Sequence, residues 1–283
     1  MTPAFALLLG ALQGATEFLP ISSSGHLALA QHFFGSAGPG GDQVAFDVVL
    51  HVATLLAVVV VYRGSLAELA GAAWRAARSP ATYRSPRAAL DHSDQLRMLL
   101  ALFIGSVPTA AIGLIFQERL EALFDRPAVV ASMLLVTSGL LVAPRLLGRA
   151  RATPPREERV VRPWQAILIG IAQGLAITPG ISRSGSTISV ALLLGIAPAL
   201  AARYSFLLSI PAILGAMLLK MGDLALEAIS TLELILGFAA AFVVGWASLT
   251  LLLATLRRGR FALFAVYTFA LGAGVLIWLQ VAR

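Results

Sequence analysis

The stretch Gly10-Ala-Leu-Gln-Gly-Ala-Thr-Glu-Phe-Leu-Pro-Ile-Ser-Ser-Ser-Gly25 returns 160 residues later as Gly170-Ile-Ala-Gln-Gly-Leu-Ala-Ile-Thr-Pro-Gly-Ile-Ser-Arg-Ser-Gly185. Seven of the sixteen aligned positions are identical, where chance in so apolar a chain would give roughly one or two. The repeat predicts a duplicated chain, with a first repeat over residues 1–150 and a second over residues 160–283.

The composition of the chain predicts a membrane protein. Hydrophobic residues make up 58% of the 283 residues, charged residues only 12%, and the mean hydropathy is +0.86. Such a chain lacks the polar surface that a soluble globular protein needs. Six apolar runs are long enough to cross a hydrocarbon core of about 30 Å as helices. These runs cover about 44–62, 98–116, 127–144, 204–219, 234–256 and 261–282. We therefore expect an all-α polytopic membrane protein, with residues 1–283 forming a single membrane domain.

The two repeated stretches have a different pattern from the six runs. Each of the segments 3–34 and 164–200 has two apolar arms joined by a centre rich in Pro, Gly and Ser, which would break a single helix. We expect each to form a re-entrant helical hairpin, which enters the membrane and returns to the same side.

The distribution of basic residues supports re-entry. With both hairpins re-entrant, sixteen of the 21 Lys and Arg residues fall on one face, in the loops 63–97, 145–162, 195–203 and 257–260. The other face, which carries both termini, holds four. Since cytoplasmic loops are enriched in Lys and Arg, both termini are predicted outside. The net charge of +7 is then explained by loops lying against anionic lipid, and it does not indicate nucleic-acid binding.

Three crossings per repeat is an odd number, so the second repeat must be inverted relative to the first. The hairpin tips, Ser22 to His26 and Ser182 to Thr187, can then meet near the middle of the bilayer. Irregular backbone at that depth is tolerated only where it is buried in protein or lines a polar cavity. We therefore place the functional site at the two tips.

The two tips offer different chemistry. The second combines Arg183 with Ser182, Ser184 and Thr187 at the start of a helix, where free N–H groups and a guanidinium favour a phosphate. The first carries the ionisable Glu17 and His26 beside the hydroxyls of its serines. Intramembrane charge is costly and therefore indicates function. Together the tips suggest phosphoryl transfer.

Each candidate also has a structural interpretation. Glu17 could be a protonated link between helices, His26 could orient Glu17, and Arg183 could cap carbonyl groups. The serines at 22, 24, 184 and 186 could be helix N-caps or close-packing residues. Gln13 and its repeat equivalent Gln173 could serve packing as well as chemistry. Asp47 and His51, four residues apart on one helix face, could form a clamp within the bundle or take part directly.

Three segments carry a resemblance to a known family. They are Gln13-Gly-Ala-Thr-Glu17-Phe-Leu-Pro20-Ile-Ser22-Ser23-Ser24-Gly-His26, Phe46-Asp47-Val-Val-Leu-His51 and Pro179-Gly-Ile-Ser182-Arg183-Ser184-Gly-Ser-Thr187. The chain resembles, nearly end to end, the undecaprenyl-diphosphate phosphatase family, also called the bacitracin-resistance protein. The resemblance implies a hydrolase of the bacterial cytoplasmic (inner) membrane. It would remove the terminal phosphate of undecaprenyl diphosphate, regenerate undecaprenyl phosphate for peptidoglycan synthesis and confer bacitracin resistance.

By this resemblance, Glu17, Ser23, His26, Ser182, Arg183 and Thr187 fall on functional positions of the family. We expect the catalytic residues to be Glu17, Ser23, His26 and Arg183, and the substrate-binding residues to be Gln13, Ser22, Ser24, Ser182, Ser184 and Thr187. The nucleophile stays open between Ser23, His26 and water.

Position 13 carries Gln, a variant that the family pattern admits in place of an acidic residue. Gln13 disfavours any mechanism or metal site that needs two carboxylates there. We expect no dedicated metal site, and any divalent cation, Mg²⁺ or Ca²⁺, would arrive with the diphosphate. The partners expected are the polyprenyl diphosphate and membrane lipids, with a homodimer left open.

A secondary transporter or lipid-phosphate flippase is the alternative, because inverted repeats with hairpins that meet in mid-membrane are also a transporter design. The difference between the tips favours the enzyme. A site that only binds and releases an anion could use two similar cradles, whereas here one tip offers a cation and the other an acid–base pair.

Overall fold

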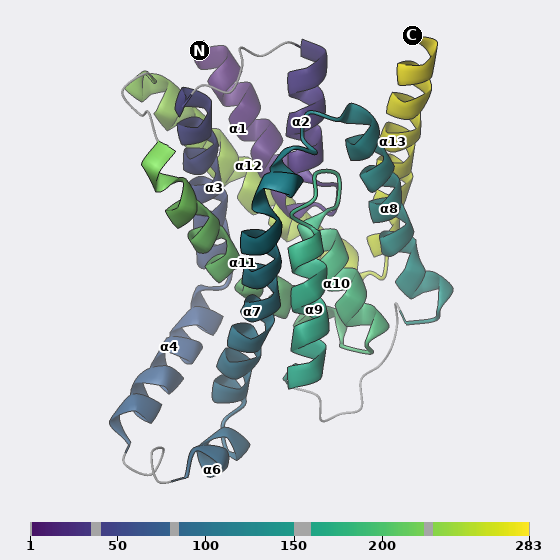
Figure 1. The fold of residues 1–283 in the computed structure, drawn as a ribbon. Helices are drawn as coiled ribbons and strands as arrows, with labels where there is room; N and C mark the ends of the chain where they lie inside the picture. Colours follow the sequence, from purple (N-terminus) through teal and green to yellow (C-terminus); the bar gives the residue numbers. More distant parts are fainter. Residues whose placement is uncertain (1, 35–40, 80–84, 150–159, 224–228, 283) are drawn as a thin grey trace.

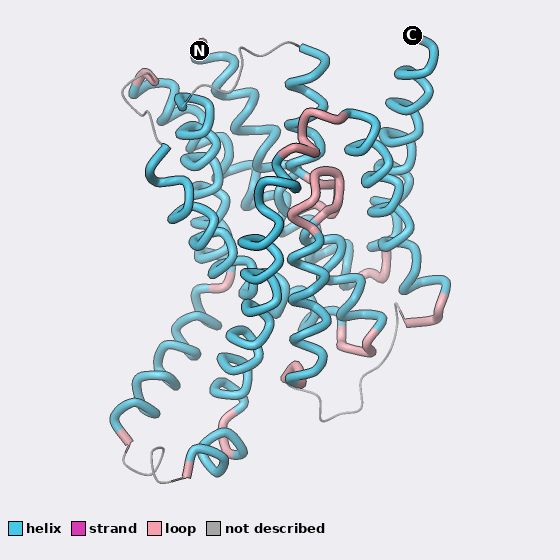
Figure 2. Tube along the Cα trace, viewed as in Figure 1, coloured by secondary structure: helices cyan, strands magenta, loops and turns pink. Residues whose placement is uncertain are grey.

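The computed structural model describes residues 2–34, 41–79, 85–149, 160–223 and 229–282, and the regular structure within these ranges is helical (Figure 2). The elements are α1 (Pro3–Phe18), α2 (Ser23–Phe34), α3 (Gly41–Val61), α4 (Arg63–Arg78), α6 (Pro86–Asp91), α7 (Asp94–Glu121), α8 (Pro127–Leu146), α9 (Pro163–Leu175), α10 (Arg183–Leu193), α11 (Pro198–Lys220), η1 (Met221–Asp223), α12 (Thr231–Arg257), η3 (Phe261–Leu263) and α13 (Phe264–Val281).

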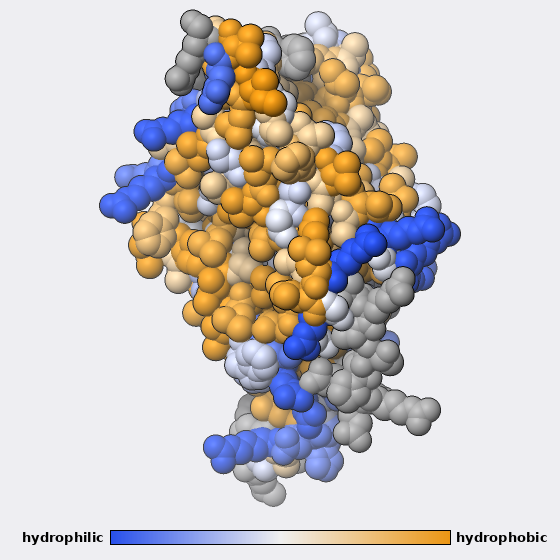
Figure 3. Space-filling model, turned by 90° about the vertical axis from the view of Figure 1, so that its right-hand side faces the viewer, coloured by the Kyte–Doolittle hydropathy of each residue, from blue (hydrophilic) through white to orange (hydrophobic). Residues whose placement is uncertain are grey.

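Five of the six predicted membrane spans are confirmed as candidate spans. Four helices, α7, α8, α11 and α12, and the segment 261–281 are each long and apolar enough to cross a membrane. The helix α3 is followed by α4 across a bend of 79°, and this pair is a sixth candidate span. The face formed by α8 and α13 presents a broad apolar surface with hydrophilic residues along its margins and at its lower end (Figure 3). The protein is a multi-pass membrane protein.

Both repeated stretches form helical hairpins, as predicted. The hairpin α1–α2 enters from the end of the bundle where both termini lie, and α9–α10 enters from the opposite end, so that their tips meet near the middle (Figure 1). The two hairpins therefore have inverted orientations. The repeat boundaries at 1–150 and 160–283 stay a prediction.

Equivalent glycines let each hairpin pack closely on a spanning helix from the other half of the chain. A Cβ at Gly10 in α1 would overlap the main-chain oxygen of Gly237 in α12. Its repeat equivalent, Gly170 in α9, meets the main-chain oxygen of Gly105 in α7 in the same way. Lipid tails are as apolar as the helix surfaces, so this close packing, rather than hydrophobic burial, holds membrane helices together. Because each hairpin packs on a helix of the other half, the two halves of the chain are interlocked.

The described parts of the segment 63–97, which the charge analysis treats as a loop, instead form α4, α6 and the start of α7. The reason is a stripe of apolar residues along one side of α4, which a count of charged residues does not detect. Leu69 and Ala72 lie one helical turn apart and are buried, and α4 contacts α7. The basic residues Arg75 and Arg78 stay on the exposed side of α4.

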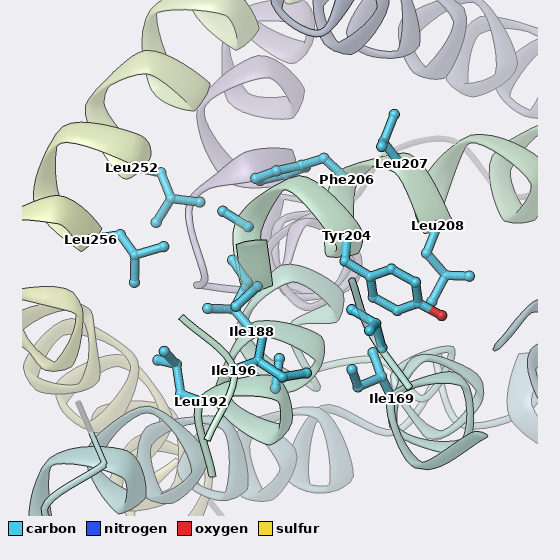
Figure 4. Packing of buried hydrophobic residues seen from close by; sticks show 14 of the residues in the cluster. Ile169, Ile188, Leu192, Ile196, Tyr204, Phe206, Leu207, Leu208, Leu252 and Leu256 are labelled. Carbon is cyan, nitrogen blue, oxygen red and sulfur yellow. The ribbon is translucent and has the colours of Figure 1, made fainter. Parts of the chain in front are cut away.

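A buried cluster beneath the tips fixes the second hairpin in place. Ile169 of α9 and Ile188 of α10 lie among the side chains of α11 and α12, including Leu208 and Leu252 (Figure 4). The fully buried Tyr204 of α11 donates its hydroxyl to the main-chain oxygen of Ala101 in α7, at 2.7 Å. Since a buried hydroxyl without a partner would be costly, this bond fixes α11 against α7.

Candidate functional site

The two tips have the same capping geometry. Ser22 and Ser182 are repeat equivalents, and each accepts a hydrogen bond from the main-chain N–H three residues later, Gly25 at 3.2 Å and Gly185 at 3.1 Å. Each capping hydroxyl also lies 3.3 Å from the hydroxyl two residues on, that of Ser24 or Ser184. Ser22 and Ser182 therefore have the structural role of N-caps in this conformation. The N-termini of α2 and α10, with their partial positive charge, both point into the centre of the bundle (Figure 1).

Contacts between the tips and with α8 hold the loops rigidly. The hydroxyl of Ser22 donates to the main-chain oxygen of Ile181, at 3.4 Å. On α8, the buried Thr137 donates to the main-chain oxygen of Gly180 at 2.8 Å and accepts from the N–H of Ser182 at 3.0 Å. Gly180 has φ +94°, and a Cβ there would overlap the main-chain oxygen of Val130. The second tip therefore needs glycine at this turn.

Strain is concentrated at the first tip. Ser22 has φ 72°, the left-handed region that residues other than glycine rarely adopt. Such strained backbone is found mostly at functional sites, where contacts with the surrounding structure hold it in place. Here the cap, the contact with Ile181 and the bonds from His26 to the main-chain oxygen of Ser22 supply that constraint.

A buried carboxylate joins the two hairpins. Glu17, at the end of α1, forms an ion pair through Oε1 with Nη2 of Arg183, the first residue of α10, 166 positions away. Its other oxygen, Oε2, accepts hydrogen bonds from the hydroxyl of Ser23 at 2.7 Å and from Nε2 of Gln13 at 3.0 Å. Four of the predicted site residues therefore form one cluster. No carboxylate lies near Arg183 in the sequence, and folding supplies one.

His51 of α3 also reaches this cluster. Its Nε2 lies 3.3 Å from Nε2 of Gln13 and 4.0 Å from Oε2 of Glu17. Its Nδ1 lies 2.8 Å from the main-chain oxygen of Asp47. The sequence left this pair open as a clamp or a direct participant. The structure places His51 against the predicted site, and a His and an Asp four residues apart within a largely apolar span were the signal in the sequence.

His26 lies at the first tip, where its hydrogen-bond partners are Ser22 and Tyr267 rather than Glu17. Its Nδ1 is 2.7 Å from the main-chain oxygen of Ser22, and its Nε2 is 2.7 Å from the hydroxyl of Tyr267 in α13, with the two rings stacked. Since a carbonyl only accepts, Nδ1 carries the hydrogen and Tyr267 donates to Nε2. Both ring nitrogens are therefore engaged, and Ser23 contacts Glu17 directly rather than through His26. Tyr267 was not among the residues expected at the site.

The hydroxyls of the second tip are inaccessible in this conformation. Ser182, Ser184 and Thr187 are buried, and the hydroxyl of Thr187 pairs with that of Ser205 in α11. By contrast, Ser23, Ser24, His26 and Arg183 are partly exposed. A bound anion would therefore meet Arg183 and the hydroxyls of the first tip, and not the hydroxyl of Thr187.

The two equivalent glutamines have diverged in role. Gln13 bridges Glu17 and His51 within the cluster, whereas Gln173 donates to Thr109 of α7 at 3.2 Å and to the main-chain oxygen of Leu208 in α11 at 3.4 Å. Gln173 thus ties helices together. Among the described residues, no group of three or more His, Asp or Glu side chains is arranged to hold a metal ion.

Comparisons with known proteins agree with the resemblance noted in the sequence. Residues 6–274 match the family described as bacitracin resistance protein BacA. The chain is 45% identical to the undecaprenyl-diphosphatase of Desulfosudis oleivorans over 280 residues, 99% of each chain. The enzyme of the same name from Desulfatibacillum aliphaticivorans is 42% identical over 274 residues, which cover 96% of each chain. The one from Salinibacter ruber is 37% identical over 276 residues, which cover 97% of this chain and 98% of the relative. The chain belongs to the bacitracin-resistance family.

In this family member, the cluster has the parts that phosphoryl transfer needs. A hydroxyl, Ser23, is within hydrogen-bond reach of a carboxylate that can accept its proton, which is the arrangement of an activated nucleophile. A guanidinium, Arg183, and two helix N-termini lie beside it to neutralise phosphate charge. The geometry therefore brings a carboxylate, a hydroxyl and a guanidinium together at one point.

Proposed function

We infer that this chain is an undecaprenyl-diphosphatase, which hydrolyses undecaprenyl diphosphate to undecaprenyl phosphate and inorganic phosphate. The family membership and the names of its relatives support this function. The structural observation that carries it is the Glu17–Arg183 pair with Ser23 bonded to the same carboxylate. The product is the lipid carrier of peptidoglycan synthesis, which fits the family's role in bacitracin resistance.

We propose that substrate binding exchanges the partners of Arg183. The terminal phosphate takes the place of Glu17 on the guanidinium and is also held by the N-termini of α2 and α10. Arg183 then stabilises the charge on the transferring phosphoryl group. The released carboxylate loses its cation and becomes a better proton acceptor.

The freed Glu17 then takes the proton of Ser23 through Oε2, and the serine oxygen attacks the terminal phosphorus. The bond to the bridging oxygen breaks, and undecaprenyl phosphate leaves with that oxygen and its electron pair. Once Glu17 has given up the proton of Ser23, it takes a proton from a water molecule, which attacks the phosphoserine. The serine oxygen leaves phosphorus and takes that proton from Glu17, and inorganic phosphate is released. Direct attack by water on the diphosphate is the simpler alternative. His26 is the least favoured of the three candidate nucleophiles, because both of its ring nitrogens take part in hydrogen bonds.

A divalent cation fits this scheme only as a companion of the substrate. The described residues offer no carboxylate cage, so Mg²⁺ or Ca²⁺ would be bound by diphosphate oxygens and would share their charge.

A homodimer also stays a prediction of the sequence.

The function is tested by phosphate release in detergent. Purified protein is expected to release inorganic phosphate from undecaprenyl diphosphate in micelles, where no membrane exists and transport cannot occur. The measurement is phosphate formed per folded protein over time, with Glu17→Gln as the matched control. Binding of the lipid without phosphate release would instead support the transporter alternative.

We further propose that the protein lies in the bacterial cytoplasmic membrane with both termini outside. Both termini lie at one end of the bundle, and α4, which carries Arg63, Arg75 and Arg78, lies at the other (Figure 1). The polyprenyl tail would leave the site laterally, between apolar helices.

The topology is tested with single cysteines, since the chain has none. Exposed Leu147, after α8, and exposed Arg258, after α12, are expected on the cytoplasmic face, and exposed Ala122, before α8, is expected outside. An impermeant maleimide added to intact cells should therefore label Ala122→Cys alone, and should label the other two after lysis. Labelling of Arg258→Cys in intact cells would show that the second hairpin spans the membrane.

A further inference from the structure

Proton removal from the buried carboxylate needs a partner that the scheme above does not contain. The side chain of Glu17 is only 4% exposed, so a proton taken from Ser23 or water has no direct way to solvent. Each turnover must nevertheless return Glu17 to its ionised form. A less buried group close to Oε2, with a lone pair that can accept the proton, is therefore required.

His51 has these properties. Its Nδ1 bonds to the main-chain oxygen of Asp47, which can only accept, so Nδ1 carries the hydrogen of the neutral ring. The lone pair of Nε2 then faces the amide of Gln13 and, at 4.0 Å, Oε2 of Glu17. The His51 side chain is 36% exposed, nine times more than that of Glu17.

Gln13 sets the relative positions of the two groups. Its single amide nitrogen, with two hydrogens, lies 3.0 Å from Oε2 of Glu17 and 3.3 Å from Nε2 of His51, so it donates to both. The gap of 4.0 Å exceeds a hydrogen bond by about 1 Å, which a small rotation of the ring or one bridging water closes. Arg183, the charged partner on the other carboxylate oxygen, leaves that oxygen when phosphate binds.

We propose that His51 is a positioning residue for Glu17 that also takes up its proton. The proton moves from the hydroxyl of Ser23, or from the attacking water, to Oε2 of Glu17. From there it moves to Nε2 of His51, whose lone pair gives up the hydrogen bond from Gln13 as the proton arrives. The imidazolium that forms keeps its Nδ1–H bond to the main-chain oxygen of Asp47 and releases the Nε2 proton from this less buried position. His51 thereby supplies the second ionisable group that Gln13 does not. This inference rests on the proposed hydrolase function.

The test separates proton uptake from hydrogen bonding. His51→Gln keeps an acceptor for Gln13 but cannot hold a proton, and it is expected to lower kcat roughly 10- to 10²-fold with KM nearly unchanged. His92→Gln, the same change at an exposed histidine outside the site, is the matched control and should retain wild-type kcat. The double variant Gln13→Glu/His51→Gln returns an ionisable group to the cluster and should recover most of the lost kcat.

A second variant distinguishes loss of proton uptake from a structural effect of the substitution. His51→Ala opens space beside Glu17, and added imidazole should restore phosphate release in this variant but not in Arg183→Ala. Wild-type kcat in His51→Gln, or failure of both the double variant and imidazole to recover activity, would overturn the role of His51. Absence of phosphate release from the wild-type protein would instead refute the hydrolase function itself.

Discussion

Arg183→Ala is expected to lower kcat/KM for undecaprenyl diphosphate by roughly 10³-fold or more, because it removes the guanidinium that we propose to hold the phosphate and neutralise its charge. Arg183→Lys should recover little, since an ammonium lacks the planar fork of the guanidinium. Arg203→Ala removes a guanidinium from a more exposed ion pair with Glu68 and is the matched control, with activity near wild type. Near-normal turnover in Arg183→Ala would refute the anion-binding role of this residue.

The same substitution should also destabilise the protein, because Glu17 is left buried without its cation. Removing one partner of a buried ion pair costs about 3–5 kcal/mol. Adding Glu17→Gln to Arg183→Ala removes the stranded charge, so the double variant should melt at a higher temperature than Arg183→Ala alone. Thermal unfolding of the detergent-solubilised proteins measures this order. A lower Tm for the double variant would contradict the ion pair.

Glu17→Gln is expected to lower kcat by roughly 10²-fold or more, because the amide cannot accept the proton of Ser23 or water. KM should not rise and is expected to fall, since Arg183 is no longer held by a carboxylate that competes with the phosphate. A structural Glu17 would tolerate the substitution, which preserves size and most hydrogen bonds. Steady-state kinetics therefore separate the two roles, with Glu118→Gln as the control at an exposed helix position.

Trapping of a phosphoenzyme would identify the nucleophile that Glu17 serves. A phosphoenzyme stable to acid and absent from Ser23→Ala would indicate Ser23. One that is stable to base and labile to acid would indicate His26. If Glu17→Gln keeps wild-type kcat, the assignment of Glu17 as the base is wrong and the transporter alternative gains support.

Much of the architecture could be predicted from the sequence because the determinants are local. A helix crosses the membrane when about 20 successive residues are apolar, and a helix breaks where Pro, Gly and Ser cluster. Both properties are visible without knowing which helices are neighbours. The exception was the segment 63–97, where charges masked the apolar stripe that contains Leu69 and Ala72 and packs α4 against α7.

The candidate site was predicted less completely, because its composition depends on which helices meet. Glu17, Ser23 and Arg183 could be named from intramembrane charge and hydroxyl clusters, and the structure brings them together. Ser182 and Thr187 could be named too, but in the fold one is an N-cap and the other pairs with Ser205. Burial and hydrogen-bond partners of this kind come from packing.

Local patterns along the chain were enough to place this protein in a membrane, to predict two broken hairpins that enter it from opposite sides, and to name the ionisable residues at membrane depth. Helix packing, by contrast, pairs Glu17 with Arg183, links His51 to Glu17 through Gln13, and brings the hydroxyl of Tyr267 against Nε2 of His26. The two kinds of interaction differ in range. Hydropathy and helix breaking act along the chain, whereas an ion pair between residues 166 positions apart forms only when helix packing brings both side chains to the same point.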